Sequence, residues 1–175
     1  TDAICDWSIG GNGIWFGSLG KIYRYSFQDS KLRLFLDITE HGPFLFSNIC
    51  DLDNETLLCT SNNGSVLVDK NTGETFESPF GTTEEISSSM IDSQGRVWIA
   101  FYNKGIGIYD KNGLLLKRYT KDCSALNCDI ILCMTERDSR VWAGTDGGGI
   151  NIIDFESDSI EIITNTPGDQ FSFPT

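Results

Sequence analysis

A unit of short apolar strands separated by glycine-rich turns occurs four times along this chain of 175 residues. The clearest copies are centred on Trp98 and Trp142, and looser copies are centred on Trp15 and Leu58. The four centres follow one another at intervals of 43, 40 and 44 residues. A period of about 40 residues with four short strands in each unit is typical of β-propeller blades. The repeat therefore predicts an all-β chain built from blades.

Turn residues divide each copy into four strands, which predicts four-stranded antiparallel blades. The predicted blades cover residues 3–36, 48–77, 86–119 and 130–164. Residues 165–175 are similar to the loop before the fourth blade, so we expect them to be a linker into a further blade. Four blades are the lower limit of known propellers, so the chain is expected to be an arc of a larger ring. No window has a sustained helical period, and almost no helix is expected.

The apolar residues predict where neighbouring blades touch. The second and third strands of each copy are predominantly apolar, as strands covered on both faces should be. Trp15, Trp98 and Trp142 are expected to fill the space between blades, because no side chain is larger. The two end blades would each keep one apolar face without a neighbour. Such faces favour association, so we expect the chain to bind neighbouring blades or a second copy of itself.

The charge of the chain argues against two classes of partner. There are 25 Asp and Glu residues against 13 Lys and Arg, which gives a net charge of −12. This charge repels nucleic-acid phosphates and anionic lipid headgroups, so neither nucleic acid nor direct membrane contact is expected. The apolar runs, such as residues 130–134, are far shorter than a transmembrane helix. Because the chain begins at Thr1 without a leader pattern, we expect it to be a piece of a longer protein.

The six cysteines lack the dense spacing of a disulfide scaffold. Cys5, Cys50 and Cys133 fall in the first strands of their blades, where a thiol is expected to be a small buried group. Cys123 and Cys128 lie in one polar loop, five residues apart. Either a disulfide between these two or a pair of free thiols is compatible with the sequence.

No motif in the chain predicts catalysis, a metal ion or a cofactor. The glycine-rich run 146–149 is followed by a strand and has no Lys-Ser/Thr pair, so it predicts a hairpin turn and not a phosphate loop. The acidic turns 51–54 and 69–74 lack the later bidentate carboxylate of a calcium loop. His41 is the only histidine, so a zinc site has little support, and no nucleophile elbow is present. The ligand-binding residues stay unassigned.

The segments 91–100 and 140–151 resemble the two-component regulator propeller repeat. Its pattern is an Asp, a turn with Gly, an apolar residue and Trp-Ile-Gly-Thr, followed by a Gly-Gly pair, an apolar strand and an Asp. The fourth copy fits this pattern best, although it lacks the glycine before Arg140. The third copy has Ala100 and a Phe in place of Gly-Thr, the second has Leu58 in place of Trp, and the first has a shorter second turn. The resemblance covers almost the whole chain.

This resemblance implies a sensor. In such proteins, periplasmic propellers and a small β-sandwich precede one membrane helix, a histidine kinase, and receiver and DNA-binding modules. The segment would then help to recognise a glycan oligosaccharide and so regulate the kinase and transcription, without being an enzyme itself. Two alternatives stay open. A propeller-fold polysaccharide lyase or glycosidase would need convergent acid and base residues, and a protein-interaction scaffold would show an exposed apolar patch.

Overall fold

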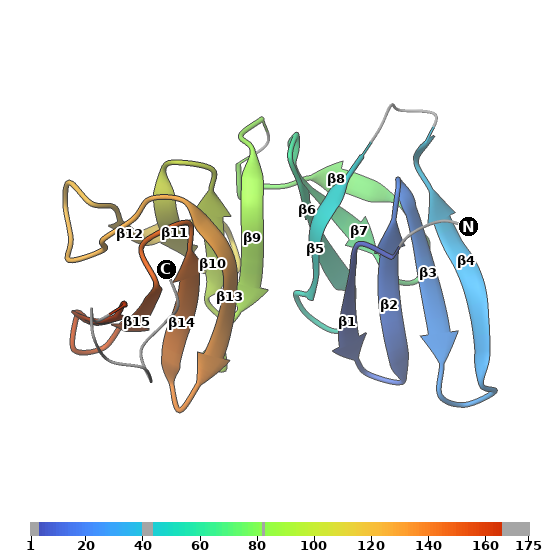
Figure 1. Cartoon of the computed structure of the whole chain (residues 1–175). Helices are drawn as coiled ribbons and strands as arrows, with labels where there is room; N and C mark the ends of the chain where they lie inside the picture. Colours follow the sequence, from blue (N-terminus) through green and yellow to red (C-terminus); the bar gives the residue numbers. More distant parts are fainter. Residues whose placement is uncertain (1–3, 40–43, 82, 166–175) are drawn as a thin grey trace.

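The computed structural model describes residues 4–39, 44–81 and 83–165. These residues form sixteen β-strands in four sheets of four strands, without an α-helix. Strands that follow one another in the sequence are neighbours in each sheet, so every sheet is a simple antiparallel meander. Figure 1 shows the sheets as a row that follows the order of the chain. The predicted all-β architecture of four four-stranded blades is therefore confirmed.

The four sheets are called blades 1 to 4, and their strands run from the inside of the arc outward. Blade 1 contains β1 (Asp6–Gly10), β2 (Gly13–Ser18), β3 (Lys21–Ser26) and β4 (Lys31–Asp37). Blade 2 contains β5 (Phe46–Asp51), β6 (Thr56–Ser61), β7 (Gly64–Asp69) and β8 (Thr75–Glu77). Blade 3 contains β9 (Ile86–Ile91), β10 (Val97–Phe101), β11 (Gly105–Tyr109) and β12 (Leu115–Tyr119). Blade 4 contains β13 (Ile131–Arg137), β14 (Arg140–Thr145), β15 (Ile150–Asp154) and β16 (Ser159–Ile163).

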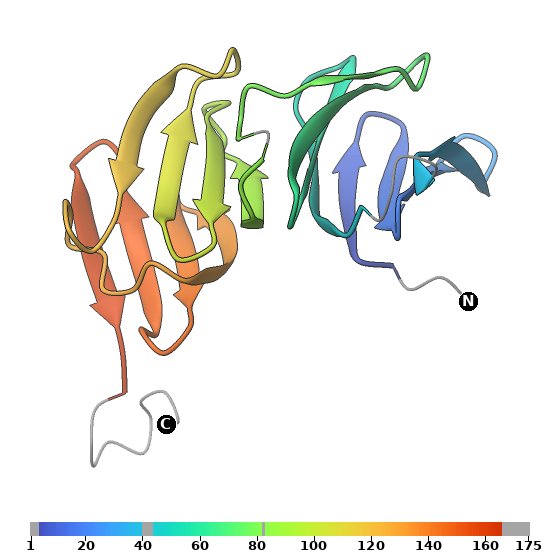
Figure 2. The ribbon, with the colours of Figure 1, turned by 90° about the horizontal axis from the view of Figure 1, so that it is seen from above.

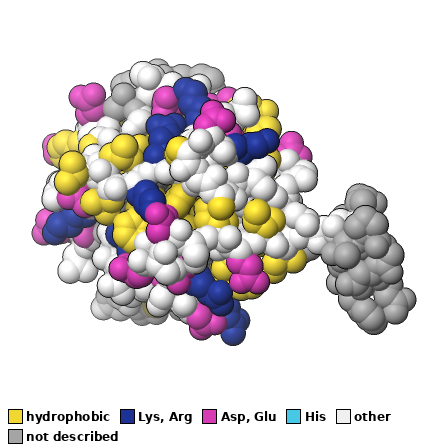
Figure 3. Space-filling model, turned by 90° about the vertical axis from the view of Figure 1, so that its left-hand side faces the viewer, with side chains coloured by type: hydrophobic (Ala, Val, Ile, Leu, Met, Phe, Trp, Pro, Cys, Tyr) yellow, Lys and Arg dark blue, Asp and Glu magenta, His cyan; other side chains and the backbone are white. Residues whose placement is uncertain are grey.

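Figure 2 shows blades 1 and 4 at the two ends of the arc. Most of the predicted linker, residues 166–175, and His41 lie outside the described residues. The described residues contain no helix that is long and apolar enough to cross a membrane. Figure 3 shows a band of hydrophobic side chains among charges of both signs, on the side of the molecule where blades 3 and 4 lie. Exposed apolar residues of these blades include Leu114, Leu115, Leu116 and Ile162.

The four repeat centres occupy equivalent places on the second strands of their blades. Trp15, Leu58 and Trp98 each point into the apolar cluster shared with the following blade. All three are at most 3% exposed, which confirms the predicted role of Trp15 and Trp98 between blades. Trp142 has the same place in blade 4, but no further described strand follows that blade. Its side chain is half-buried, and its indole N–H has no hydrogen-bond partner among the described residues.

Polar side chains of the innermost strands fix the spacing between successive blades. Asp6 of β1 accepts a hydrogen bond from the backbone N–H of Ile49 in β5 at 2.7 Å. Asn48 has the equivalent position in β5, and its Oδ1 accepts from the backbone N–H of Ser89 in β9 at 2.7 Å. The same device thus joins blade 1 to blade 2 and blade 2 to blade 3.

All six cysteines are free thiols, so Cys123 and Cys128 do not form the disulfide that the sequence left open. The prediction of a buried thiol is confirmed for Cys50 and wrong for Cys5 and Cys133, which are exposed. Cys5 precedes the first strand instead of lying within it. Cys133 lies on the same face of blade 4 as Trp142, where no described blade covers it. Burial of these thiols is therefore decided by the neighbouring blade and not by the strand.

This difference in burial predicts how the thiols react. Burial raises the pKa of the Cys50 thiol to about 12, and it also raises the pKa of Cys59. Both groups therefore stay protonated and unreactive at pH 8, because the thiolate is the nucleophile. We expect iodoacetamide to modify Cys5, Cys123 and Cys133 in the native protein, and to modify Cys50 and Cys59 only after unfolding. Peptide mass mapping checks this, and native modification of Cys59 at the rate of Cys133 would contradict it.

Candidate functional site

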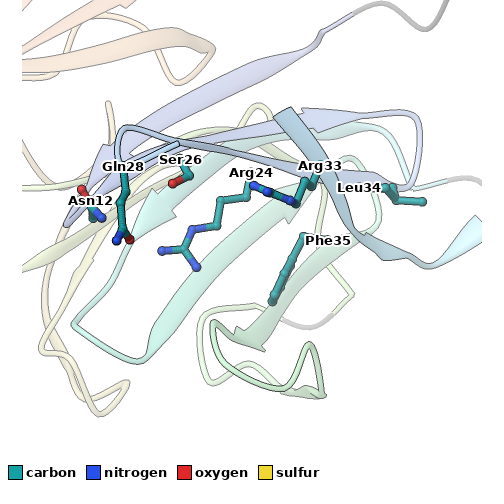
Figure 4. Close-up of a pocket in the computed structure, with 7 residues that line it drawn as sticks. All are labelled: Asn12, Arg24, Ser26, Gln28, Arg33, Leu34 and Phe35. Carbon is teal, nitrogen blue, oxygen red and sulfur yellow. The ribbon is translucent and has the colours of Figure 1, made fainter. Parts of the chain in front are cut away.

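A hollow of about 330 Å³ opens at the outer edge of blade 1. Figure 4 shows Arg24 reaching from β3 into its middle, with Phe35 on one side and two amide side chains on the other. The side chains that line the hollow are Asn12, Arg24, Ser26, Gln28, Arg33, Leu34 and Phe35. A second hollow of about 100 Å³ shares Asn12 and Arg24 with the first and continues toward Asp51, Asn54 and Lys70 of blade 2. The two together form one polar cleft between blades 1 and 2.

The cleft exists because the outer strands of the two blades differ in length. The outer strand of blade 1, β4, has seven residues, whereas the outer strand of blade 2, β8, has only three. Blade 2 therefore leaves the outer part of the facing surface of blade 1 uncovered. The inner part of the same surface is closed by Trp15, which packs edge-on against Phe35 at 4.9 Å between ring centroids. The aromatic pair forms the apolar floor of an otherwise polar cleft.

Arg24 has a different electrostatic setting from the other two cations of the cleft. Arg33 is paired with Asp29, and this guanidinium holds the pKa of the Asp29 carboxyl below its usual range. Lys70 is paired with Asp51. The Arg24 guanidinium lies 5.1 Å from the centre of the Trp15 ring, and it has no ion pair or hydrogen bond within the described residues. Its positive charge is thus held in place but not neutralised.

Arg24 also departs from the repeat. The strand register places it opposite Trp15, and the residues opposite the other three repeat centres are Leu67, Ile108 and Ile152. Ile108 and Ile152 are buried, with 0% and 4% of their surface exposed. An apolar side chain therefore satisfies the fold at this position. The sequence analysis did not single out Arg24, although a position-by-position comparison of the four copies contains the signal.

A separate inner hollow of about 340 Å³ runs along the innermost strands β1, β5 and β9. Its main polar groups are already engaged, since Asp6 and Asn48 hold the backbone of the next blade. Trp7, 56% exposed, is the aromatic surface in this hollow that stays open to a ligand. We therefore take the cleft at Arg24 as the candidate site, and the inner hollow as the secondary one.

The motifs singled out in the sequence have structural roles. Asp69 accepts hydrogen bonds from the backbone N–H groups of Asn71 and Thr72 at 2.8 and 2.7 Å, which is an Asx turn. Asp53 does the same for Glu55 and for the residue after it. The glycine run 146–149 joins β14 to β15 as a hairpin turn. No group of three or more His, Cys, Asp or Glu in the described ranges is placed to hold a metal ion.

No family model matches the sequence, and no curated protein matches it. Solved structures do match the fold. The extracellular domain of BT4673 from B. thetaiotaomicron, described as a hybrid two component system, aligns with 93% of this chain at a TM-score of 0.68 and 16% identity. The chain spans 25% of the length of that domain.

Two other propellers match about as well. Virginiamycin B lyase from Staphylococcus aureus aligns with 91% of this chain and over 55% of its own length, with a TM-score of 0.68 and 17% identity. The WD40 beta propeller domain of Doa1 aligns with 86% of this chain and over 50% of its own, with a TM-score of 0.67 and 18% identity. The chain has a β-propeller fold. Because a sensor domain, a lyase and a WD40 domain match it equally, these likenesses show the fold and do not select a function.

Proposed function

We propose that the chain is a ligand-sensing propeller segment in the periplasmic region of a hybrid two-component sensor. There it helps to recognise a glycan oligosaccharide and so regulates a histidine kinase. Two observations support this proposal, the resemblance of the repeats and the cleft at Arg24. The likeness of the fold to the extracellular domain of a hybrid two component system is compatible with it. The cleft carries most weight, because it is a property of this chain's own side chains.

The side chains of the cleft suit a sugar. Hydroxyl groups donate and accept hydrogen bonds, and Asn12, Ser26 and Gln28 offer both kinds of group around the hollow. Phe35 provides an apolar wall for the C–H face of a sugar ring, whose hydrogens are attracted by the negative face of the aromatic ring. A few oriented polar groups beside an apolar surface are the usual composition of a small-molecule site.

Calorimetry against a broad panel of glycan oligosaccharides tests the proposal. We expect at least one oligosaccharide to bind the intact chain, and Gln28→Ala to weaken that binding by about threefold to tenfold, because it removes one hydrogen-bonding group. Gln94→Ala is the matched control, since Gln94 is an exposed turn residue of blade 3. The sensing proposal is wrong if no member of the panel binds, or if both variants change binding equally.

An enzymatic role has weaker support from the carboxylates of the chain. Backbone N–H groups of the following turn residues lower the pKa of Asp69, Asp110 and Asp154, with Thr72, Leu114 and Ser157 as the main donors. A carboxyl held in this way stays ionised near neutral pH and is a poor general acid. These groups are spread over the hairpin turns of blades 2, 3 and 4, and do not converge on one hollow.

A further inference from the structure

We infer that the cleft at Arg24 recognises an acidic sugar unit, one that carries a carboxylate or sulfate group. This inference rests on the proposed function and names the ligand class of the same site. Arg24 is the cation of the cleft whose charge is not matched by a carboxylate within the described residues, whereas Arg33 and Lys70 are each paired. An anion on the ligand supplies the partner that this guanidinium lacks.

The geometry of Arg24 suits such a partner. The Arg24 guanidinium lies 5.1 Å from the centre of the Trp15 ring, and Figure 4 shows it projecting into the hollow, where its N–H groups can reach a ligand. A planar guanidinium binds carboxylate and sulfate oxygens through two parallel hydrogen bonds. Asn12 borders both parts of the cleft, as Arg24 does, so its amide can contact a ligand that spans them. Because the contact with the Trp15 ring already holds Arg24 in place, Arg24 loses less conformational entropy on binding.

The rest of the chain makes this site selective. A net charge of −12 repels anions from most of the surface, so an acidic sugar is held only where a local positive charge offsets that field. The other three blades have an apolar residue at the position of Arg24, namely Leu67, Ile108 and Ile152. The guanidinium is therefore not required for packing.

Paired probes test the inference: an oligogalacturonate against its neutral methyl ester, and a sulfated carrageenan oligosaccharide against its desulfated form. We expect at least one acidic probe to bind more tightly than its neutral partner. Arg24→Leu should weaken the binding of that acidic probe by about tenfold to hundredfold, which is the effect of losing a hydrogen-bonded charge. Arg24→Lys should lose less affinity, since it keeps the charge without the planar pair of donors. Added salt should weaken the binding of the acidic probe more than that of its neutral partner.

Two controls keep the result interpretable. Arg24→Leu should unfold at the wild-type temperature or above, because the equivalent residues are apolar, so lost binding cannot be assigned to unfolding. Arg137→Leu removes an arginine that is 77% exposed in blade 4, and it should leave binding unchanged. Equal binding of acidic and neutral partners, or an acidic preference that survives Arg24→Leu, overturns this inference but leaves sensing of neutral glycans standing. Absence of binding by every probe and by the wider glycan panel overturns both.

Discussion

Replacing Asp92 with alanine is expected to lower the free energy of unfolding by about 3–5 kcal/mol, because it breaks a buried ion pair and leaves a buried indole N–H without an acceptor. The Asp92 side chain is 1% exposed and forms an ion pair with Nε of Arg96 at 2.6 Å. It also accepts a hydrogen bond from the indole N–H of Trp98 at 2.8 Å and from the backbone N–H of Gln94 at 3.0 Å. One carboxylate therefore accepts hydrogen bonds from Gln94, Arg96 and Trp98.

The effect should reach the next blade, because Arg96 also joins blade 3 to blade 4. Its guanidinium bonds Glu156 at 2.7 Å and lies 4.1 Å from the centre of the Phe155 ring. Trp98, 1% exposed, packs in the cluster shared with blade 4. Without Asp92, the indole N–H of Trp98 loses its acceptor, and the Arg96 guanidinium is left with Glu156 as its carboxylate partner. Asp92→Asn keeps the size of the side chain and one acceptor oxygen, so a smaller loss is expected.

Urea unfolding followed by tryptophan fluorescence measures this effect. Asp110→Ala is the matched control, because Asp110 also closes a hairpin turn of blade 3 but binds only that turn, with no link to blade 4. We expect the control to lose about 0.5–2 kcal/mol, as for the loss of a capping side chain. Equal losses for the two variants would contradict a role of Asp92 in joining the blades.

The middle strands could be predicted from the sequence, and the innermost strands less well. In blade 1, β2 at Gly13–Ser18 is an apolar run that follows a glycine turn, whereas β1 begins at Asp6 and not at residue 3, where the predicted blade begins. Middle strands are covered on both faces and therefore read as apolar runs between glycine turns. Innermost strands carry polar residues such as Asp6 and Asn48, which bind the next blade and interrupt the apolar pattern.

The candidate site could not be predicted, because it depends on packing between blades. The cleft arises from the short β8, and the strand register alone brings Arg24 beside Trp15. Neither fact is local to a motif. The half-buried state of Trp142 and the exposed thiol of Cys133 have the same origin. Their burial depends on whether another blade covers blade 4, and the sequence of blade 4 does not contain that information.

The two end faces of the arc are complementary halves of one blade interface. On the face that no described blade covers, blade 4 carries half-buried Trp142 and the exposed thiol of Cys133. The equivalents of Trp142 in the other three blades pack against the following blade. Blade 1 offers the receiving half, where Trp7 and Leu32 are 56% and 58% exposed and Phe16 is half-buried. Cys59, the equivalent of Phe16 in blade 2, is fully buried against blade 1. From the three interfaces within the chain, we infer that another blade of the same repeat would fit each end face.

We expect a second copy of the chain to supply that blade, with blade 1 of each copy packed on blade 4 of the other. The chain spans 50% of a WD40 propeller domain, so two copies match the size of one closed ring. Light scattering should then give twice the 19.4 kDa mass of the chain. Because the contact is apolar and the chain carries a net charge of −12, added salt should strengthen association by screening the repulsion.

Leu32→Glu should return the protein to its 19.4 kDa monomer, because it places a further negative charge in the apolar contact of an already acidic chain. Leu116→Glu is the matched control, since Leu116 is an exposed leucine of the outer strand β12, away from both end faces. A wild-type protein that stays monomeric at every concentration and salt level would refute the contact. A mass that rises continuously with concentration would refute the closed ring, because a head-to-tail contact that fails to close grows into an open chain.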